Sequence, residues 1–176
     1  AMIEFRGFNP EATDTLVKAL GDKLTVQKSA WTCNLTVTLN TEKKPFDDVR
    51  VRRALSLAID RYEANRVLSK ISLMGPVGGV LRPGAEFSAT EEELSKLIGF
   101  SKDIDASRKE AVRLLKEAGV PDGFAFTLTN RNIPEPYEPT GIFVIDQWRK
   151  VGLNVKQNAA PTYQNDLRAG NFDAGI

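Results

Sequence analysis

Histidine is absent from this 176-residue chain, and cysteine occurs only once, at Cys33. Without histidine, neither a Ser-His-Asp triad nor a Cys-His pair can form, and the commonest metal ligand is missing. A single cysteine excludes an internal disulfide and a cysteine-based zinc site, but it does not identify the cellular compartment. These absences argue against the commonest nucleophilic enzymes and against a zinc protein.

Long apolar runs and an excess of one charge are also missing. No apolar stretch approaches the ~20 residues of a membrane-spanning helix. The 24 Lys and Arg residues nearly balance 23 Asp and Glu residues, for a net charge of +1. Nucleic-acid or anionic-membrane binding usually needs a strong basic excess, so neither is expected. No secretion signal is present, but Ala1 before Met2 suggests an excised piece of a longer gene. The missing signal then says nothing about whether the protein is exported.

What is present is the composition of an ordinary folded domain, with 41% hydrophobic and 27% charged residues. Capping residues and apolar periodicity predict a series of helices and strands. The expected N-caps are Asn9, Asp47, Asp60, Thr90, Asp105 and Thr162, and a further helix is expected over 142–151. The expected strands are 24–28, 34–40, 124–129, 153–157 and 172–176.

The second half of the chain predicts a βαβ unit, because a strand, a helix and a strand follow one another within ~35 residues. The two strands of such a unit should be parallel. The chain is therefore expected to be a single α/β domain over 1–176, with a mixed sheet flanked by helices and with a sheet partner missing at its C-terminal edge.

Three arginines, Arg50, Arg52 and Arg53, follow two aspartates in the segment KKPFDDVRVRRALSLAIDR. Guanidinium groups can capture phosphate or another anion. The aspartates, however, already occupy the anion-attracting end of the helix and would repel a phosphate. We therefore expect a charge network that braces the helix rather than a ligand site.

Paired carboxylates offer a second chemistry, general acid–base catalysis. A carboxylate-based hydrolase could use Asp103 with Asp105, or Asp146. The acidic pairs lie at helix starts, where capping explains them, and no base or nucleophile partner is visible. The hydrolase stays as the alternative from another class, together with a self-associating structural module.

The segment TNRNIPEPYEP, residues 129–139, is the strongest candidate for ligand contact, because it follows a strand and precedes a helix, where α/β sheets bind ligands. It supplies Asn130, Arg131, Asn132 and Tyr137, and its prolines should keep it extended. The loop GPVGGVLRPG is either a connector or a place of close ligand approach. Trp31 suits packing or cleft lining equally, whereas Trp148 lies on an apolar helix stripe and should be core.

Four segments together resemble the bacterial extracellular solute-binding proteins of family 5, which feed ABC importers for oligopeptides, dipeptides and nickel. The resemblance covers nearly the whole chain, and the segments occur in the family's order: NTEKKPFDDVRVRRALSLAIDR, DIDASRKEAVRLLKEAG, FTLTNR with IDQWRKVGLNV, and YQNDLRAGNFDAGI. The resemblance implies one lobe, the C-terminal one, of a two-lobed type II periplasmic-binding-protein-like fold. It also implies that the PFDDVRVRRAL segment is scaffold.

The resemblance implies a non-catalytic receptor, without cofactor or metal, that is periplasmic or anchored outside the cell as a lipoprotein. Its partners would be a peptide or other small solute, a missing N-terminal lobe and a membrane permease, and no nucleic acid. The solute could be a peptide, oligosaccharide, opine or metal chelate. The arginine that holds the ligand carboxylate in dipeptide-binding members has no counterpart in TGIFVIDQW, which argues against dipeptide specificity.

Overall fold

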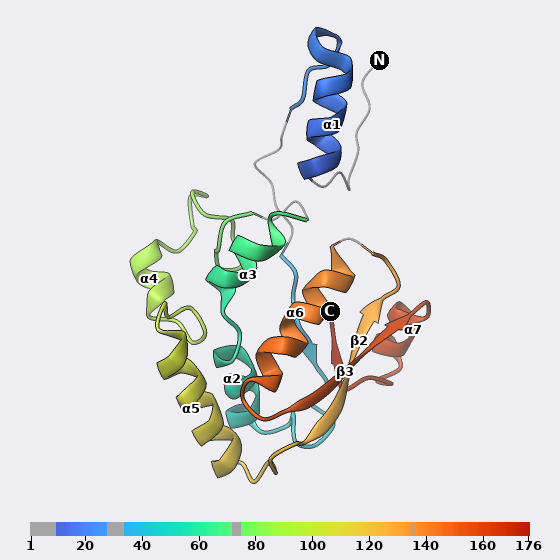
Figure 1. The fold of residues 1–176 in the computed structure, drawn as a ribbon. Helices are drawn as coiled ribbons and strands as arrows, with labels where there is room; N and C mark the ends of the chain where they lie inside the picture. The colour runs from blue at the N-terminus through green and yellow to red at the C-terminus, as the bar shows by residue number, and fades with distance from the viewer. Residues whose placement is uncertain (1–9, 28–33, 72–74, 135) are drawn as a thin grey trace.

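The computed structural model describes residues 10–27, 34–71, 75–134 and 136–176, and all structural statements concern these ranges. The helices are α1 (Pro10–Leu20), the 3-10 turn η1 (Gly21–Lys23), α2 (Val49–Leu57), α3 (Arg61–Leu68), α4 (Glu91–Ser95), α5 (Ile104–Glu117), α6 (Tyr137–Arg149) and α7 (Tyr163–Arg168). The strands are β1 (Thr38–Leu39), β2 (Ala125–Arg131), β3 (Asn154–Ala160) and β4 (Ala174–Gly175). Figure 1 shows their arrangement.

The four strands form one mixed sheet in the order β1-β4-β2-β3. Strand β2 is parallel to β3 and to β4, whereas β1 is antiparallel to β4. The parallel pairing of β2 and β3 around α6 confirms the βαβ unit that the sequence predicts. Strand β2 is thus an inner strand, and its C-terminal end lies beside the end of β3.

The core joins the helices to the sheet through Trp148 of α6, which is 1% exposed. Its indole nitrogen donates to the backbone oxygen of Leu55 in α2 at 3.0 Å, and its ring lies 5.3 Å from the ring of Phe126 in β2. Phe46 packs edge-on against the other side of Phe126, at 5.2 Å. The prediction that Trp148 is a core residue is confirmed.

Successive side chains of β2 point to opposite faces of the sheet, and helices cover both faces. Phe126 points toward α6, where it meets Trp148. Arg131 points to the opposite face, where its guanidinium lies over the ring of Tyr163 at the start of α7. Helix α1, in contrast, has no buried residue, and in Figure 1 it lies apart from the sheet and the other helices.

Two predicted helix caps are displaced by one or two residues, one makes no capping hydrogen bond, and those of Asp60 and Thr90 are confirmed. The N-cap of α2 is Asp48 rather than Asp47, and that of α5 is Asp103 rather than Asp105. Thr162 gives α7 no side-chain cap, because its hydroxyl hydrogen-bonds to the carboxylate of Asp166 instead. The reciprocal capping box of Thr90 and Glu93 is confirmed.

Two predicted strands and one predicted loop are also corrected. Residues 24–27 form no strand, and of 34–40 only the two residues of β1 do. Helix α6 begins at Tyr137, five residues before the predicted Ile142, so the loop after β2 is shorter than expected. Proline is tolerated in the first turn of a helix because the backbone amide there needs no partner, and Pro139 occupies such a position.

Asp103 and Asp105, at the start of α5, give a matched test of capping. Asp103 accepts a hydrogen bond from the amide of Ala106 at 2.9 Å, whereas Asp105 lies within the first turn and acts on the helix dipole alone. We expect Asp103→Ala to lower the free energy of unfolding by about 1 kcal/mol. Asp105→Ala should cost a few tenths of a kcal/mol. Urea unfolding, monitored by circular dichroism, measures the free energy of unfolding of both variants. An equal decrease in the two variants would mean that the negative charge, and not the capping hydrogen bond, stabilises the helix.

Candidate functional site

The candidate site lies at the C-terminal end of β2, where the chain leaves the sheet and starts α6. We call its five residues the Arg131 cluster: Asn130, Arg131, Tyr137, Gln157 and Tyr163. They come from β2, α6, β3 and α7, which meet at this edge in Figure 1. Ligands of open α/β sheets bind outside the carboxyl ends of parallel strands, so the position agrees with the sequence-based expectation.

Asn130 is fully buried and connects three elements at this edge. Its side-chain amide donates to the backbone oxygen of Tyr137 at 2.7 Å and, more weakly, to the side-chain oxygen of Gln157 at 3.4 Å. Its own side-chain oxygen accepts from the amide of Arg131 at 2.7 Å. Because its amide group both donates and accepts within the protein, Asn130 holds the turn between β2 and α6, and its contact with a ligand remains a prediction.

Gly141 makes this close packing of α6 on the sheet possible. A Cβ atom at this position would lie 2.0 Å from the side-chain oxygen of Gln157 and 2.6 Å from the side-chain nitrogen of Asn130. No larger residue fits without displacing these groups. Gly141 therefore leaves room for the side-chain amides of Asn130 in β2 and Gln157 in β3 beside α6.

Arg131 is half-buried and fixed by aromatic side chains. The carbon at the centre of its guanidinium lies 4.5 Å from the ring centre of Tyr137 and 5.1 Å from that of Tyr163. Its Nη1 donates to the hydroxyl of Tyr137. Its Nε is buried and has no hydrogen-bond partner. The two rings and this hydrogen bond restrict the orientation of the guanidinium.

Of the other predicted site residues, Asn132 is exposed, and Trp31 lies outside the described residues. The glycine loop is tied elsewhere: the side chain of Asn34 donates to the backbone oxygen of Val80 at 2.5 Å, and that of Asn65 to Gly75. Within the described ranges, no hydrogen bond joins the loop to the Arg131 cluster. A role for these residues in ligand binding remains a prediction.

Sequence reasoning missed Gln157 and Tyr163, which complete the cluster. Gln157 lies in a strand with irregular polarity, and Tyr163 opens a short helix after Pro161 and Thr162. Neither position has a local motif. The parallel register sets Gln157 beside Leu128 and the end of β3 beside Arg131, and α7 with Tyr163 follows directly after that end.

Two of the three arginines after Asp48 make hydrogen bonds within the protein that stabilise α2. Arg50 pairs with Asp48 and donates to the backbone oxygen of Glu117 at the end of α5. Arg50 lowers the pKa of Asp48 to about 2 through its hydrogen bonds. Arg52 donates to the backbone oxygens of Phe46 and Asp47. These two arginines therefore brace α2, whereas Arg53 is exposed.

The carboxylates proposed for catalysis are used in other ways. Asp103 is a helix cap, and Asp146 accepts from Lys150 at 2.8 Å, one helical turn away. The hydrogen bond from Lys150 lowers the pKa of Asp146, which weakens it as a base. Over the described ranges, no group of three acidic or cysteine side chains could hold a metal ion, and no helix is long and apolar enough to cross a membrane.

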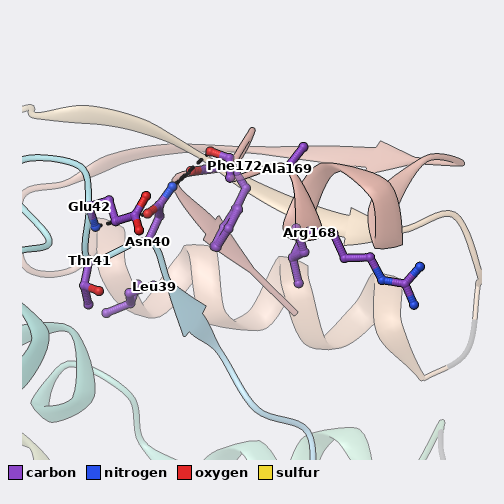
Figure 2. A pocket seen from close by; sticks show the side chains of 9 residues that line it. Leu39, Asn40, Thr41, Glu42, Arg168, Ala169 and Phe172 are labelled. Carbon is purple, nitrogen blue, oxygen red and sulfur yellow. Dashed lines mark hydrogen bonds between the residues drawn. The ribbon is translucent and has the colours of Figure 1, made fainter.

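A small polar cavity of about 320 Å³ lies between β1 and the C-terminal end of α7. Figure 2 shows Asn40 in its wall, with its side chain directed at the backbone near Phe172. That side chain donates at 3.0 Å to the backbone oxygens of Gly170 and Phe172 and accepts from the amide of Glu42. The side chain of Asn40 is therefore paired within the chain and joins β1 to the segment after α7.

Two asparagines of the candidate site provide a second prediction. Asn130→Ala would leave the amide of Arg131 without its acceptor and the backbone oxygen of Tyr137 without this donor. We expect the free energy of unfolding to fall by roughly 1–3 kcal/mol. Asn132→Ala, an exposed change two residues away, should stay within about 0.5 kcal/mol. Urea unfolding measures the free energy of unfolding of both variants. An Asn130→Ala variant as stable as the unaltered chain would contradict the role assigned to Asn130.

Comparison with known proteins agrees with this architecture. The model of the family "Bacterial extracellular solute-binding proteins, family 5 Middle" matches residues 5–176. The periplasmic oligopeptide-binding protein OppA of Haemophilus influenzae is 31% identical over 95% of this chain and 31% of its own length. The dipeptide-binding protein of Escherichia coli is 28% identical over 68% of this chain and 21% of its own length.

Among solved structures, Haemophilus influenzae OppA in complex with the peptide RPPGFSPFR superposes with a TM-score of 0.70 and 27% identity. The match covers 96% of this chain and 33% of that chain, so the present chain spans about a third of such relatives. The predicted α/β fold of a periplasmic-binding-protein lobe, with a mixed sheet and flanking helices, is confirmed. The chain belongs to the bacterial extracellular solute-binding proteins of family 5.

Proposed function

We propose that the chain is one lobe of the solute-binding component of an ABC importer. The intact receptor takes a peptide-like solute in a cleft between two lobes and delivers it to a membrane permease. Its place is the periplasm, or the outer face of a membrane if a lipid anchors it. Residues 1–176 form a single lobe in this proposal, and the other lobe comes from the remainder of a longer polypeptide.

Family membership is the observation that carries the proposal. The matched relatives are named as periplasmic oligopeptide-binding, dipeptide-binding and glutathione-binding proteins, and all three names refer to peptides. Members of this family are binding proteins of transporters rather than enzymes. We extend this property to the present chain, which then performs no chemistry on its solute.

The Arg131 cluster supports the same function from the structure. It lies at the strand ends, its backbone turn is fixed by Asn130, and it presents a cation between two aromatic rings. We propose Arg131, Asn132 and Tyr137 as cleft residues, with Asn130 as the residue that positions them. Trp31 is kept as a cleft residue on sequence grounds alone.

Large exposed apolar side chains fit a lobe that another part of the polypeptide covers. Phe87 is 81% exposed and Val80 is 87% exposed, both in the segment between α3 and α4. Large exposed apolar side chains favour association when they form a contiguous patch. The same exposure supports a second candidate, self-association of the 176-residue chain. Sedimentation equilibrium distinguishes a monomer from a dimer.

A single lobe should bind solute weakly, because half a cleft provides half the contacts and leaves the polar groups of the solute in water. We expect calorimetry of the 176-residue chain with oligopeptides to give dissociation constants of about 1 mM or weaker. Micromolar binding by this chain alone would contradict the need for a second lobe.

The intact gene product tests the function itself. It should co-purify with a peptide-like solute that native mass spectrometry detects and that denaturation releases. Calorimetry on the stripped protein should then show binding of that solute in the micromolar range or tighter. An intact, folded product that binds no peptide in either measurement would overturn the proposal.

A further inference from the structure

We propose that Arg149 protects the open edge of the sheet from pairing with a strand of a second copy of this chain. It does so by occupying a backbone oxygen of β3 that an incoming strand would need. This role does not depend on the proposed function, because it concerns the outer edge of the domain and not a cleft. Its basis is the strand order, the direction of the backbone groups of β3 and one hydrogen bond.

Strand β3 is one end of the sheet. The order β1-β4-β2-β3 gives it a single neighbour, β2, whereas β2 and β4 each have a neighbour on both edges. The strand at the other end, β1, has two residues, but β3 has seven. A long edge strand offers a row of unpaired backbone groups that another strand can join. In the described part of the chain, β3 is therefore the edge that most needs protection.

The backbone groups of alternate residues in β3 face the open edge. In a parallel pair, the N–H and C=O of one residue point to the neighbouring strand, and those of the next residue point away from it. The amide of Asn154 donates to the backbone oxygen of Phe124 at 2.9 Å, so the even-numbered residues of β3 face β2. Val155, Gln157 and Ala159 therefore direct their N–H and C=O groups away from the sheet.

One of these outward groups is already occupied by a side chain. Arg149, the last residue of α6, donates from Nη2 to the backbone oxygen of Val155 at 3.0 Å. Arg149 is exposed, and in the same turn it is Lys150 that pairs with Asp146. An incoming strand would have to displace this donor and take an unpaired charge out of water, which is costly. The hydrogen bond thus blocks the first half of the open edge.

Lys156 is placed to act in the same direction. It is exposed in the middle of β3, and alternation puts its side chain on the face opposite to that of Val155, which belongs to the core. Lysine on an edge strand discourages pairing with another strand. The other residues of β3 are uncharged, so Arg149 and Lys156 supply the charge along this edge.

Another interpretation of the same hydrogen bond is that it only ties the end of α6 to β3. A cation in the last turn of a helix also interacts favourably with the helix dipole. Both effects predict a loss of stability when Arg149 is removed, but neither predicts a new contact between chains. Association through β3 is therefore the observation that separates protection of the edge from a structural tie.

The experiment compares Arg149→Ala with a matched control, Arg66→Ala. Both substitutions lower the formal net charge of +1 by one, which by itself promotes association, and Arg66 lies on α3 with a 69% exposed side chain. In sedimentation velocity, Arg149→Ala should associate at about tenfold lower protein concentration than the unaltered chain or the control. Arg149→Lys keeps a charged donor and should behave as the unaltered chain.

Hydrogen exchange locates the contact. In the unaltered chain, the amides of Gln157 and Ala159 should exchange roughly 100-fold faster than those of Lys156 and Asn158, which face β2. In associated Arg149→Ala, the amides of Gln157 and Ala159 should become protected. Adding Ala159→Pro to this variant should restore the monomer, because proline removes a donor from the open edge and none from the pairing with β2.

Protection of the two outward amides in Arg149→Ala, and its reversal by Ala159→Pro, would support the role. An Arg149→Ala variant that associates no more than Arg66→Ala would overturn it. So would association that Ala159→Pro leaves unchanged, or slow exchange of Gln157 and Ala159 in the intact, unaltered gene product, since the edge would then already be covered.

Two complications leave the test decisive. If the 176-residue chain dimerises through its exposed apolar side chains, the amides of Gln157 and Ala159 still report on the edge separately. If Arg149→Ala does not fold, Arg149→Met takes its place with the same expected results, because it keeps the apolar stem of the side chain and removes the donor and the charge. Neither result bears on solute binding, so the proposed function stands or falls by its own experiments.

Discussion

The burial of strand β2 is the constraint on which the rest of the structure depends. Its neighbours are β3 on one edge and β4 on the other, and helices cover both of its faces. Leu128 and Asn130 are both fully buried. A polar residue in such a position must find all its hydrogen bonds inside the protein. Asn130 does so by holding the first turn of α6, which couples the end of the strand to the start of the helix.

This coupling determines the direction in which Arg131 projects. Successive side chains of a strand point to opposite faces, so a strand that buries Asn130 against α6 must direct Arg131 toward α7. The aromatic rings at the starts of both helices then lie within reach of the same guanidinium. The position of the cation is therefore a consequence of strand register and not of any contact with an acid.

Several charged residues of the described ranges bind the ends of helices. Asp48, Asp60 and Asp103 each accept a backbone amide in the first turn of the following helix. Arg50 and Arg52 return hydrogen bonds to backbone oxygens or to Asp48. Such contacts explain a concentration of charge without any ligand, and the scaffold interpretation of the PFDDVRVRRAL segment agrees with them.

Local patterns in the sequence were sufficient to predict the βαβ unit, the capping box of Thr90 and the core position of Trp148. They failed where two residues compete for one role, as with Asp103 and Asp105, because either carboxylate can serve as the cap and the backbone decides. They also failed at the start of α6, where Pro134, Pro136 and Pro139 favour an extended chain until packing of Gly141 against the sheet stabilises the helix. The partners of Arg131 required the register of three elements, which no local pattern contains.

In a two-lobed receptor, the electrostatic environment of Arg131 would change with closure. While the lobes are open, water screens a cation at the rim of the sheet and reduces the energy of any pairing. Closure would remove that water, so an acid that met this cation would interact with it more strongly in the closed form than in the open one. A ligand shifts a conformational equilibrium only through such a difference in affinity between the two forms. Under the proposed function, Arg131 fits such a role because it contacts the rings of Tyr137 and Tyr163 and forms no ion pair with an acid of the described residues.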